Sequence, residues 1–147
     1  MKIQITTKVN NTIGNVYKGF DKYLFMQLSP PFPIITVRRF DGCNKGDAVH
    51  LDISFGIFKE RWISIITDNV QTEDKIYFID EGMMLPFFLK YWRHTHILEK
   101  IEENKTAIID VIEYRAINAL VEILVYPFLY LQFLYRKPIY QKIFNRH

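Results

Sequence analysis

The chain has 147 residues, of which 49% are hydrophobic, 16% aromatic and 24% charged. This length suits one domain over residues 1–147, and the composition excludes a disordered or collagen-like chain. The formal net charge is only +3 and no basic stripe crosses the body of the sequence, so nucleic-acid binding is not expected. A single cysteine, Cys43, excludes a disulfide framework and a cysteine-based zinc site.

The first thirty residues predict a strand followed by two short helices. Residues 2–9 alternate between polar and apolar side chains, as a half-buried strand does. Residues 10–12 supply capping side chains for a short or broken helical pair, which must end before the prolines of residues 30–33. The first nine residues contain no apolar run of signal-peptide length, so a cytoplasmic location is expected.

The middle of the chain predicts an antiparallel meander. Segments with strand-like alternation are separated by turns rich in Asp, Gly, Asn, Lys and Glu. Short links of this kind favour antiparallel neighbours. The predicted strands are residues 33–40, 47–55, 61–69, 75–81, 87–100 and 105–116. With the first segment they make a sheet of about six or seven strands.

A long helix is predicted over residues 119–144, with a kink at Pro127 where the bond to the Ile123 carbonyl is lost. Its middle turns, residues 123–131, are apolar on all sides and need cover on more than one face. The sheet would cover one side, and a homodimer is an alternative for the other. The charge-free run of residues 123–135 is shorter than a membrane span, so stable membrane insertion is not expected.

The C-terminal end of this helix is basic. Arg136, Lys137, Lys142 and Arg146 occur there without an acidic residue. We expect a solvated helix end whose cations interact favourably with the helix dipole. An anionic membrane surface is the alternative partner for these charges.

The last predicted hairpin determines which side chains share a face of the sheet. A turn at residues 102–104 places Arg93 opposite Glu113 and Tyr91 opposite Arg115, which indicates an outer face with an ion pair. The same register puts three pairs on the inner face: Trp92 with Tyr114, His94 with Ile112, and His96 with Asp110. For the preceding hairpin, a turn at residues 70–74 places Ile66 opposite Phe78 and Ser64 opposite Asp80.

The predicted inner face is too polar for a sealed core. Buried polar groups without partners cost roughly 1 to 3 kcal/mol each. A cavity that holds a hydrophobic or aromatic small molecule accounts for these groups, although core packing alone explains the aromatic ones equally well. The candidate ligand-binding residues are Trp62, Ser64, Phe78, Asp80, Trp92, His94, His96, Asp110 and Tyr114.

His94 and His96 lie on one face of a strand, and Asp110 lies opposite them. Two histidines and a carboxylate form a set found in open metal sites. Alternatively, Asp110 only orients His96, while His94 meets water or a ligand. On the second interpretation, which we prefer, no metal or other cofactor is expected. His50 and His147 have no evident partners.

Catalysis is an open alternative to binding. Asp80, Asp110 and Glu113 could supply an acid and a base, but no phosphate-binding loop, nucleophile elbow or zinc-protease motif is present in the sequence. An enzyme of the cyclase or hydrolase kind would use His94 or His96 as general base, oriented by Asp110. A third hypothesis is a non-catalytic interaction or membrane-peripheral module.

The order of strand, helix pair, meander and terminal helix resembles the START-like or SRPBCC superfamily, whose helix-grip fold is shared with birch-pollen-allergen-like proteins and polyketide cyclases. Several segments look like a bacterial branch described as ligand-binding and labelled a cell-division-inhibitor relative. They are residues 28–32, residues 85–87 with Trp92-x-His94-x-His96, Asp110-x-x-x-Tyr114 and Phe133-x-Tyr135-Arg136. The chain departs from this branch by lacking Gly near Leu85 and a Gly-rich entry to the last helix.

The resemblance implies an α+β fold in which a curved antiparallel sheet wraps around a long C-terminal helix. It further implies a deep hydrophobic cavity between them, used in the superfamily for lipids, sterols, quinones, plant hormones and polyketides. Carriers, cyclases, hydrolases and co-chaperones all occur among its members. The resemblance therefore favours small-molecule binding and implies no particular reaction.

Overall fold

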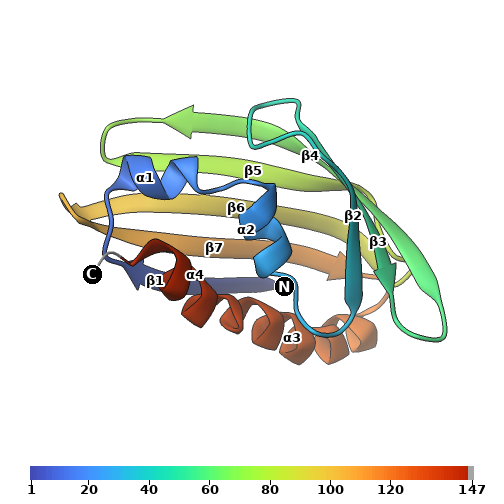
Figure 1. The fold of residues 1–147 in the computed structure, drawn as a ribbon. Helices are drawn as coiled ribbons and strands as arrows, with labels where there is room; N and C mark the ends of the chain where they lie inside the picture. The colour runs from blue at the N-terminus through green and yellow to red at the C-terminus, as the bar shows by residue number, and fades with distance from the viewer. Residues whose placement is uncertain (146–147) are drawn as a thin grey trace.

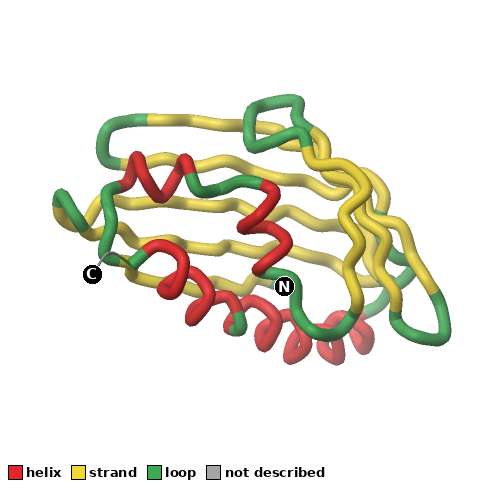
Figure 2. Tube along the Cα trace, viewed as in Figure 1, coloured by secondary structure: helices red, strands yellow, loops and turns green. Residues whose placement is uncertain are grey.

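The computed structural model describes residues 1–145, which form a curved antiparallel sheet packed against helices on its concave side (Figures 1 and 2). The seven strands are β1 (Lys2–Val9), β2 (Ile34–Phe40), β3 (Ala48–Ser54), β4 (Lys59–Gln71), β5 (Lys75–Met84), β6 (Leu89–Glu102) and β7 (Lys105–Ala116). The four helices are α1 (Ile13–Lys18), α2 (Lys22–Gln27), α3 (Ala119–Leu134) and α4 (Arg136–Phe144).

The sheet has the strand order β1-β7-β6-β5-β4-β3-β2, and every neighbouring pair is antiparallel. From β2 to β7 each strand pairs with the next one in the chain, while β1 pairs with β7, the last. The predicted strands and the short helical pair after the first strand are confirmed. The molecule has the α+β helix-grip fold.

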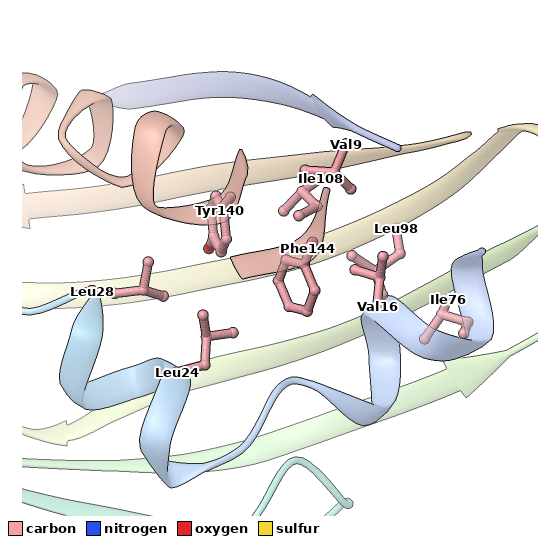
Figure 3. Packing of buried hydrophobic residues seen from close by; sticks show 9 residues of the cluster. All are labelled: Val9, Val16, Leu24, Leu28, Ile76, Leu98, Ile108, Tyr140 and Phe144. Atoms are coloured by element: carbon pink, nitrogen blue, oxygen red, sulfur yellow. The ribbon is translucent and has the colours of Figure 1, made fainter. Parts of the chain in front are cut away.

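Side-chain caps start the two short helices. Thr12 Oγ1 accepts a hydrogen bond from the Asn15 backbone N–H at the start of α1, and Asp21 accepts one from Leu24 at the start of α2. These helices close one end of the sheet together with α4. The apolar side chains gathered there form a core cluster, shown in Figure 3: Val9, Val16, Leu24, Leu28, Ile76, Leu98, Ile108, Tyr140 and Phe144.

The C-terminal helix is divided where we did not expect it. The sequence pattern predicts one helix over residues 119–144, whereas α3, which contains Pro127, ends at Leu134. Tyr135 separates α3 from α4, three residues before Pro138. Proline has no N–H to donate, and its ring collides with the carbonyl four residues earlier, so it is accommodated in the first turn of a new helix.

The register of the last hairpin is confirmed. Trp92 pairs with Tyr114, His94 with Ile112 and His96 with Asp110. Arg93 also lies opposite Glu113 as predicted, but its side chain instead forms an ion pair with Glu81, on the other neighbouring strand, at 3.8 Å.

The predicted register of the preceding hairpin is wrong. Ile66 pairs with Asp80 instead of Phe78, and Ser64 pairs with Gly82 instead of Asp80. β4 extends to Gln71, into the predicted turn, while β5 begins at Lys75 as predicted, and the pairing shifts between Ile66 and Asp68. The displaced turn causes most of the difference, since Gln71 pairs with Ile76, and the bulge then changes the register by one residue.

Much of α3 is exposed and apolar. By length and composition alone, the helical stretch Ala119–Phe144 is long and apolar enough to cross a membrane, with a mean hydropathy of 1.2 in its most apolar 18-residue window. Only 11% of that window is buried. The length of the charge-free run, residues 123–135, is therefore not enough to argue against a membrane span, because the apolar part of the helix extends beyond this run.

The two edge strands of the sheet, β1 and β2, are protected in different ways. Lys137 of α4 donates a hydrogen bond from Nζ to the carbonyl of Thr6 on β1. At the opposite edge, the pairing of β2 with β3 shifts between Val37 and Arg39, which marks a bulge.

Candidate functional site

A cavity of about 570 Å³ lies between the sheet and α3. Its lining is mainly apolar, with side chains from the proline-rich segment of residues 30–33, from β2 and β3, and from one face of α3. Phe32, Phe128 and Leu131 line it and are 61, 76 and 62% exposed, so the cavity opens to the surface between α3 and the proline-rich segment. Its size and character suit a small apolar molecule.

The structure brings five of the nine predicted site residues to this cavity. They are Trp62, Ser64, Asp80, Trp92 and His94. The other four, Phe78, His96, Asp110 and Tyr114, lie on the same side of the sheet but outside the cavity lining. Phe78 stacks on His96 with ring centroids 4.4 Å apart.

Tyr114 is a structural residue in this arrangement. Its side chain is buried, and its hydroxyl donates a 2.7 Å hydrogen bond to the Glu122 carbonyl in α3. It therefore ties β7 to the first turns of the helix.

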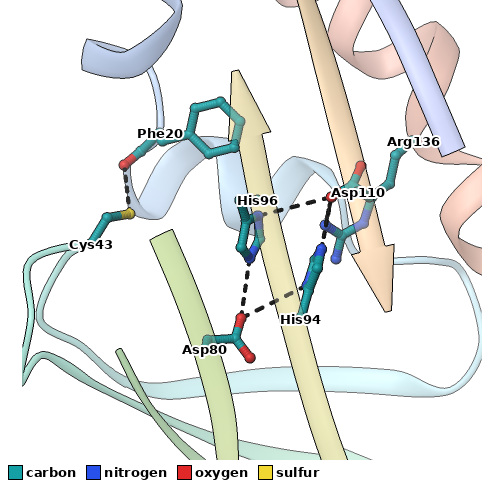
Figure 4. Close-up of polar contacts among 7 residues, drawn as sticks. All are labelled: Phe20, Cys43, Asp80, His94, His96, Asp110 and Arg136. Carbon is teal, nitrogen blue, oxygen red and sulfur yellow. Dashed lines mark hydrogen bonds and ion pairs between the residues drawn. The ribbon is translucent and has the colours of Figure 1, made fainter. Parts of the chain in front are cut away.

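Two histidines and two aspartates form a polar cluster at the wall of the cavity (Figure 4). His94 Nε2 lies 2.8 Å from Asp110 Oδ1, and His96 Nε2 lies 3.1 Å from Asp80 Oδ2. The second nitrogen of each ring faces the other aspartate at 3.8 Å. We call Asp80, His94, His96 and Asp110 the His–Asp cluster.

These pairings correct the sequence interpretation, in which Asp110 orients His96 and leaves His94 free. Each histidine bonds to the aspartate diagonal to it, whereas the directly opposed pairs are His96 with Asp110 and His94 with Asp80. Long side chains in a twisted sheet reach diagonal neighbours as well as direct ones. The register alone could not distinguish these two arrangements.

Arg136 is a site residue that sequence reasoning placed wrongly in a solvated basic end. Its side chain is only 10% exposed, with Nη1 3.8 Å from Asp110 Oδ1 and the guanidinium 4.4 Å from the Phe133 ring centroid. It lines the cavity together with Gln132, which lies four residues earlier on the same helical face. That i, i+4 spacing was the signal in the sequence that could have placed Arg136 at the site.

Two residues named in the sequence analysis, Arg146 and His147, lie outside the described residues.

Burial sets the protonation of this cluster. It lowers the pKa of His94 to about 4, against the opposing effect of Asp110, so His94 is neutral at pH 7. Burial by itself would raise the pKa of Asp110, but the hydrogen bond from His94 and the charge of Arg136 outweigh it and lower this pKa to about 2. The pKa of Asp80 is also lowered, by the hydrogen bond from His96 against the effect of burial.

Known structures share this fold at low sequence identity. A crystal structure of protein Ms6760 from Mycobacterium smegmatis matches with a TM-score of 0.69 and 14% identity, over 99% of this chain and 91% of that one. No family model and no curated protein sequence matches the chain.

Two of the similar structures are of enzymes. Norcoclaurine synthase from Thalictrum flavum, in complex with dopamine and hydroxybenzaldehyde, has a TM-score of 0.61 and 14% identity, over 95% of this chain and 86% of that one. The Zhui aromatase/cyclase from Streptomyces sp. R1128 has a TM-score of 0.58 and 11% identity, over 81% and 70%. Identities this low establish the fold and not the activity.

Proposed function

We propose that this protein binds a hydrophobic or aromatic small molecule, of the lipid, quinone or polyketide-like kind, in the cavity between the sheet and α3. The observation that carries the proposal is an apolar cavity of about 570 Å³ with a small group of ionisable residues on one wall. Apolar burial supplies affinity, at roughly 25 cal/mol per Å² before ordering costs. The polar groups then select and orient the ligand.

Three polar side chains are placed for that role. Ser64, His94 and Arg136 all line the cavity. Because His94 Nε2 is engaged by Asp110, its Nδ1 is the nitrogen left on the side of Asp80, which also lines the cavity. A ligand with a polar group at one end would place it here and its apolar body toward Phe128.

The first experiment is native mass spectrometry of the freshly purified protein, followed by solvent extraction of any released compound. We expect a stoichiometric apolar adduct that is lost on denaturation. If the protein is purified without an adduct, the same cavity is tested with the fluorescent probe 1-anilinonaphthalene-8-sulfonate.

A matched pair of variants decides whether binding occurs in this cavity. Leu51→Trp adds bulk to a buried residue of the cavity wall, whereas Ile57→Trp changes a 94% exposed residue in the loop between β3 and β4. We expect Leu51→Trp to abolish adduct or probe binding and Ile57→Trp to retain it, with both circular dichroism spectra unchanged. Equal binding by the two variants would refute the proposal.

An enzymatic function of the cyclase or hydrolase kind is favoured by one observation, the 2.8 Å pair of His94 and Asp110 beside the cavity. The same pair also argues against it, because an imidazole with a pKa of about 4 is a weak general base at pH 7. We therefore place binding first. Turnover of an identified ligand that disappears in His94→Gln would reverse this order.

Three more specific predictions from the sequence accompany this proposal. We retain the resemblance to the cell-division-inhibitor-related branch, the cytoplasmic location and the homodimer as predictions. The exposed apolar side chains of α3 support either a second copy or a membrane surface as the cover of this helix. Sedimentation and liposome flotation separate the two.

A further inference from the structure

The His–Asp cluster brings three atoms that can ligate a metal ion close together. Asp80, His94 and His96 each offer one metal-ligating atom, and the three atoms lie within 4.8 Å of one another. Around a tetrahedral ion with bonds of about 2.0 to 2.1 Å, such atoms would be roughly 3.3 Å apart. Asp80 Oδ2 lies 3.1 Å from His96 Nε2 and 3.8 Å from His94 Nδ1, close to that separation.

The position of the proton on His94 leaves a lone pair directed at a carboxylate. An ionised carboxylate only accepts hydrogen bonds, so the 2.8 Å contact with Asp110 places the proton of neutral His94 on Nε2. Nδ1 then carries a lone pair and lies 3.8 Å from Asp80 Oδ2. Two electron-rich atoms facing each other are stabilised by a cation between them.

His96 has the complementary arrangement. Its Nδ1 is buried and has no hydrogen-bond partner among residues 1–145, and it lies 3.8 Å from Asp110 Oδ1. If a metal ion takes the Nε2 lone pair, the single proton of the neutral ring moves to Nδ1 and faces Asp110. One carboxylate then stands behind both histidines, which is the usual outer-shell arrangement of metal-bound imidazoles.

The charges also leave room for a cation. Asp80 and Asp110 carry two negative charges, and Arg136 is the cation beside Asp110, 3.8 Å away. The phenol of Tyr140, which also packs here, is neutral because burial raises its pKa. Two carboxylates beside one arginine in a largely buried cluster favour the binding of a further cation.

We propose that His94 Nδ1, His96 Nε2 and a carboxylate oxygen of Asp80 form a binding site for one divalent transition-metal ion, with Zn²⁺ as the first candidate. Asp110 is the positioning residue that fixes the proton on the far side of both rings. Asp80 and His94 line the cavity, so the remaining coordination position faces the space where a ligand would bind. The proposal extends the proposed function by adding a metal to the polar wall of the same cavity.

The test uses the full chain, freed of metal with a chelator, and the metal ion alone without any apolar ligand. Zn²⁺ is titrated by calorimetry at pH 7.5, and Co²⁺ is titrated by its visible absorption. We expect one equivalent of metal per chain, with Zn²⁺ displacing Co²⁺. If the folded protein binds no metal at 1 mM, a concentration that corresponds to a binding free energy of about 4 kcal/mol, the proposed site is wrong.

Variants distinguish this site from adventitious binding. We expect Asp80→Asn and His96→Gln each to weaken binding by on the order of a hundredfold or more, since each removes a ligand. Asp110→Asn should weaken it by about 10 to 100-fold through the loss of the outer-shell acceptor. The control is His50→Gln, a half-buried histidine on β3, which should leave affinity unchanged.

Two results would overturn the assignment even if metal binds. One is unchanged affinity in Asp80→Asn, and the other is a loss in His50→Gln as large as in His96→Gln. Circular dichroism confirms that each variant is folded. Leu51→Trp should keep its metal affinity while losing apolar binding, so failure of the proposed function and failure of the metal site are distinguishable.

Discussion

At the scale of single residues, the structure separates Tyr114 from the ligand-binding role that its position in the sequence suggests. Its hydroxyl bonds to the Glu122 carbonyl in α3 instead of reaching the cavity. We expect Tyr114→Phe to lower the free energy of unfolding by about 1 kcal/mol, the typical value of one buried hydrogen bond. Ligand affinity should stay within error of the wild type.

Urea denaturation and ligand titration on the same preparation check this prediction. If Tyr114→Phe kept full stability but lost ligand affinity, its hydroxyl would belong to the binding site after all.

Cys43 is a second residue whose chemistry is set by its surroundings. Its thiol donates to the Phe20 carbonyl at 3.5 Å (Figure 4), and burial raises its pKa to about 12. Only the thiolate reacts with alkylating agents, so native Cys43 should react at pH 8 about 10³-fold more slowly than an ordinary cysteine of pKa about 8.5. The rate should rise about tenfold per pH unit until the pKa is reached.

Iodoacetamide labelling followed by mass spectrometry measures this rate, with the urea-unfolded chain as control. Rapid modification of the native protein at pH 8 would show that the thiol is not buried as described.

At the scale of elements, α3 depends on its first residue. The Asn118 side chain accepts a hydrogen bond from the Val121 backbone N–H and so caps the helix. We expect Asn118→Ala to lower stability by about 1 kcal/mol and Asn118→Ser to retain most of it, because serine also caps helices. Thermal denaturation of the three proteins tests this, and an equal loss in both variants would indicate that the cap is not the cause.

The register of a strand pair could be predicted from the sequence where residues close to the turn determine it. The β6–β7 register followed from one short turn and two opposed charges, and it is correct. The β4–β5 register failed because β4 runs on to Gln71, which pairs with Ile76, so the turn lies further along the chain than residues 70–74, and the bulge after Ile66 shifts the pairing once more. The inward direction of Arg136 was missed although its i, i+4 spacing from Gln132 placed the two on one helical face, because the basic residues that follow it suggested a solvated end.

The candidate site was predictable as a face of the sheet but not as a set of bonds. Five of the nine residues line the cavity, since alternation along strands assigns faces reliably. Which histidine meets which aspartate depends on side-chain rotamers and sheet twist. A single sequence carries neither.

At the scale of the whole molecule, the two ends of the sheet should differ in local stability. One end is filled by the core cluster under α1, α2 and α4, while the other is hollow and walled by β2 and β3. We expect amides of β2 and β3 to exchange hydrogen faster than those of β6 and β7, because local opening there breaks fewer apolar contacts. Cavity occupation should slow the exchange of β2 and β3.

Hydrogen exchange read by mass spectrometry of peptides resolves the two ends. Equal protection of all four strands would mean that the hollow end is as tightly held as the filled one.

The bulge in β2 affects whether two molecules of this protein can associate through their edge strands. β2 is an edge strand, and an edge strand that is flat and uncharged offers its free amides and carbonyls to a strand of another molecule. Here the pairing shifts beside Arg38 and Arg39, whose exposed side chains form ion pairs with Asp52 and Asp41, so this edge is bulged and lined by charged groups. At the other edge, Lys137 occupies the Thr6 carbonyl. Both edge strands, β1 and β2, therefore resist pairing with strands of other molecules, even though the neighbouring helix α3 has an exposed apolar surface.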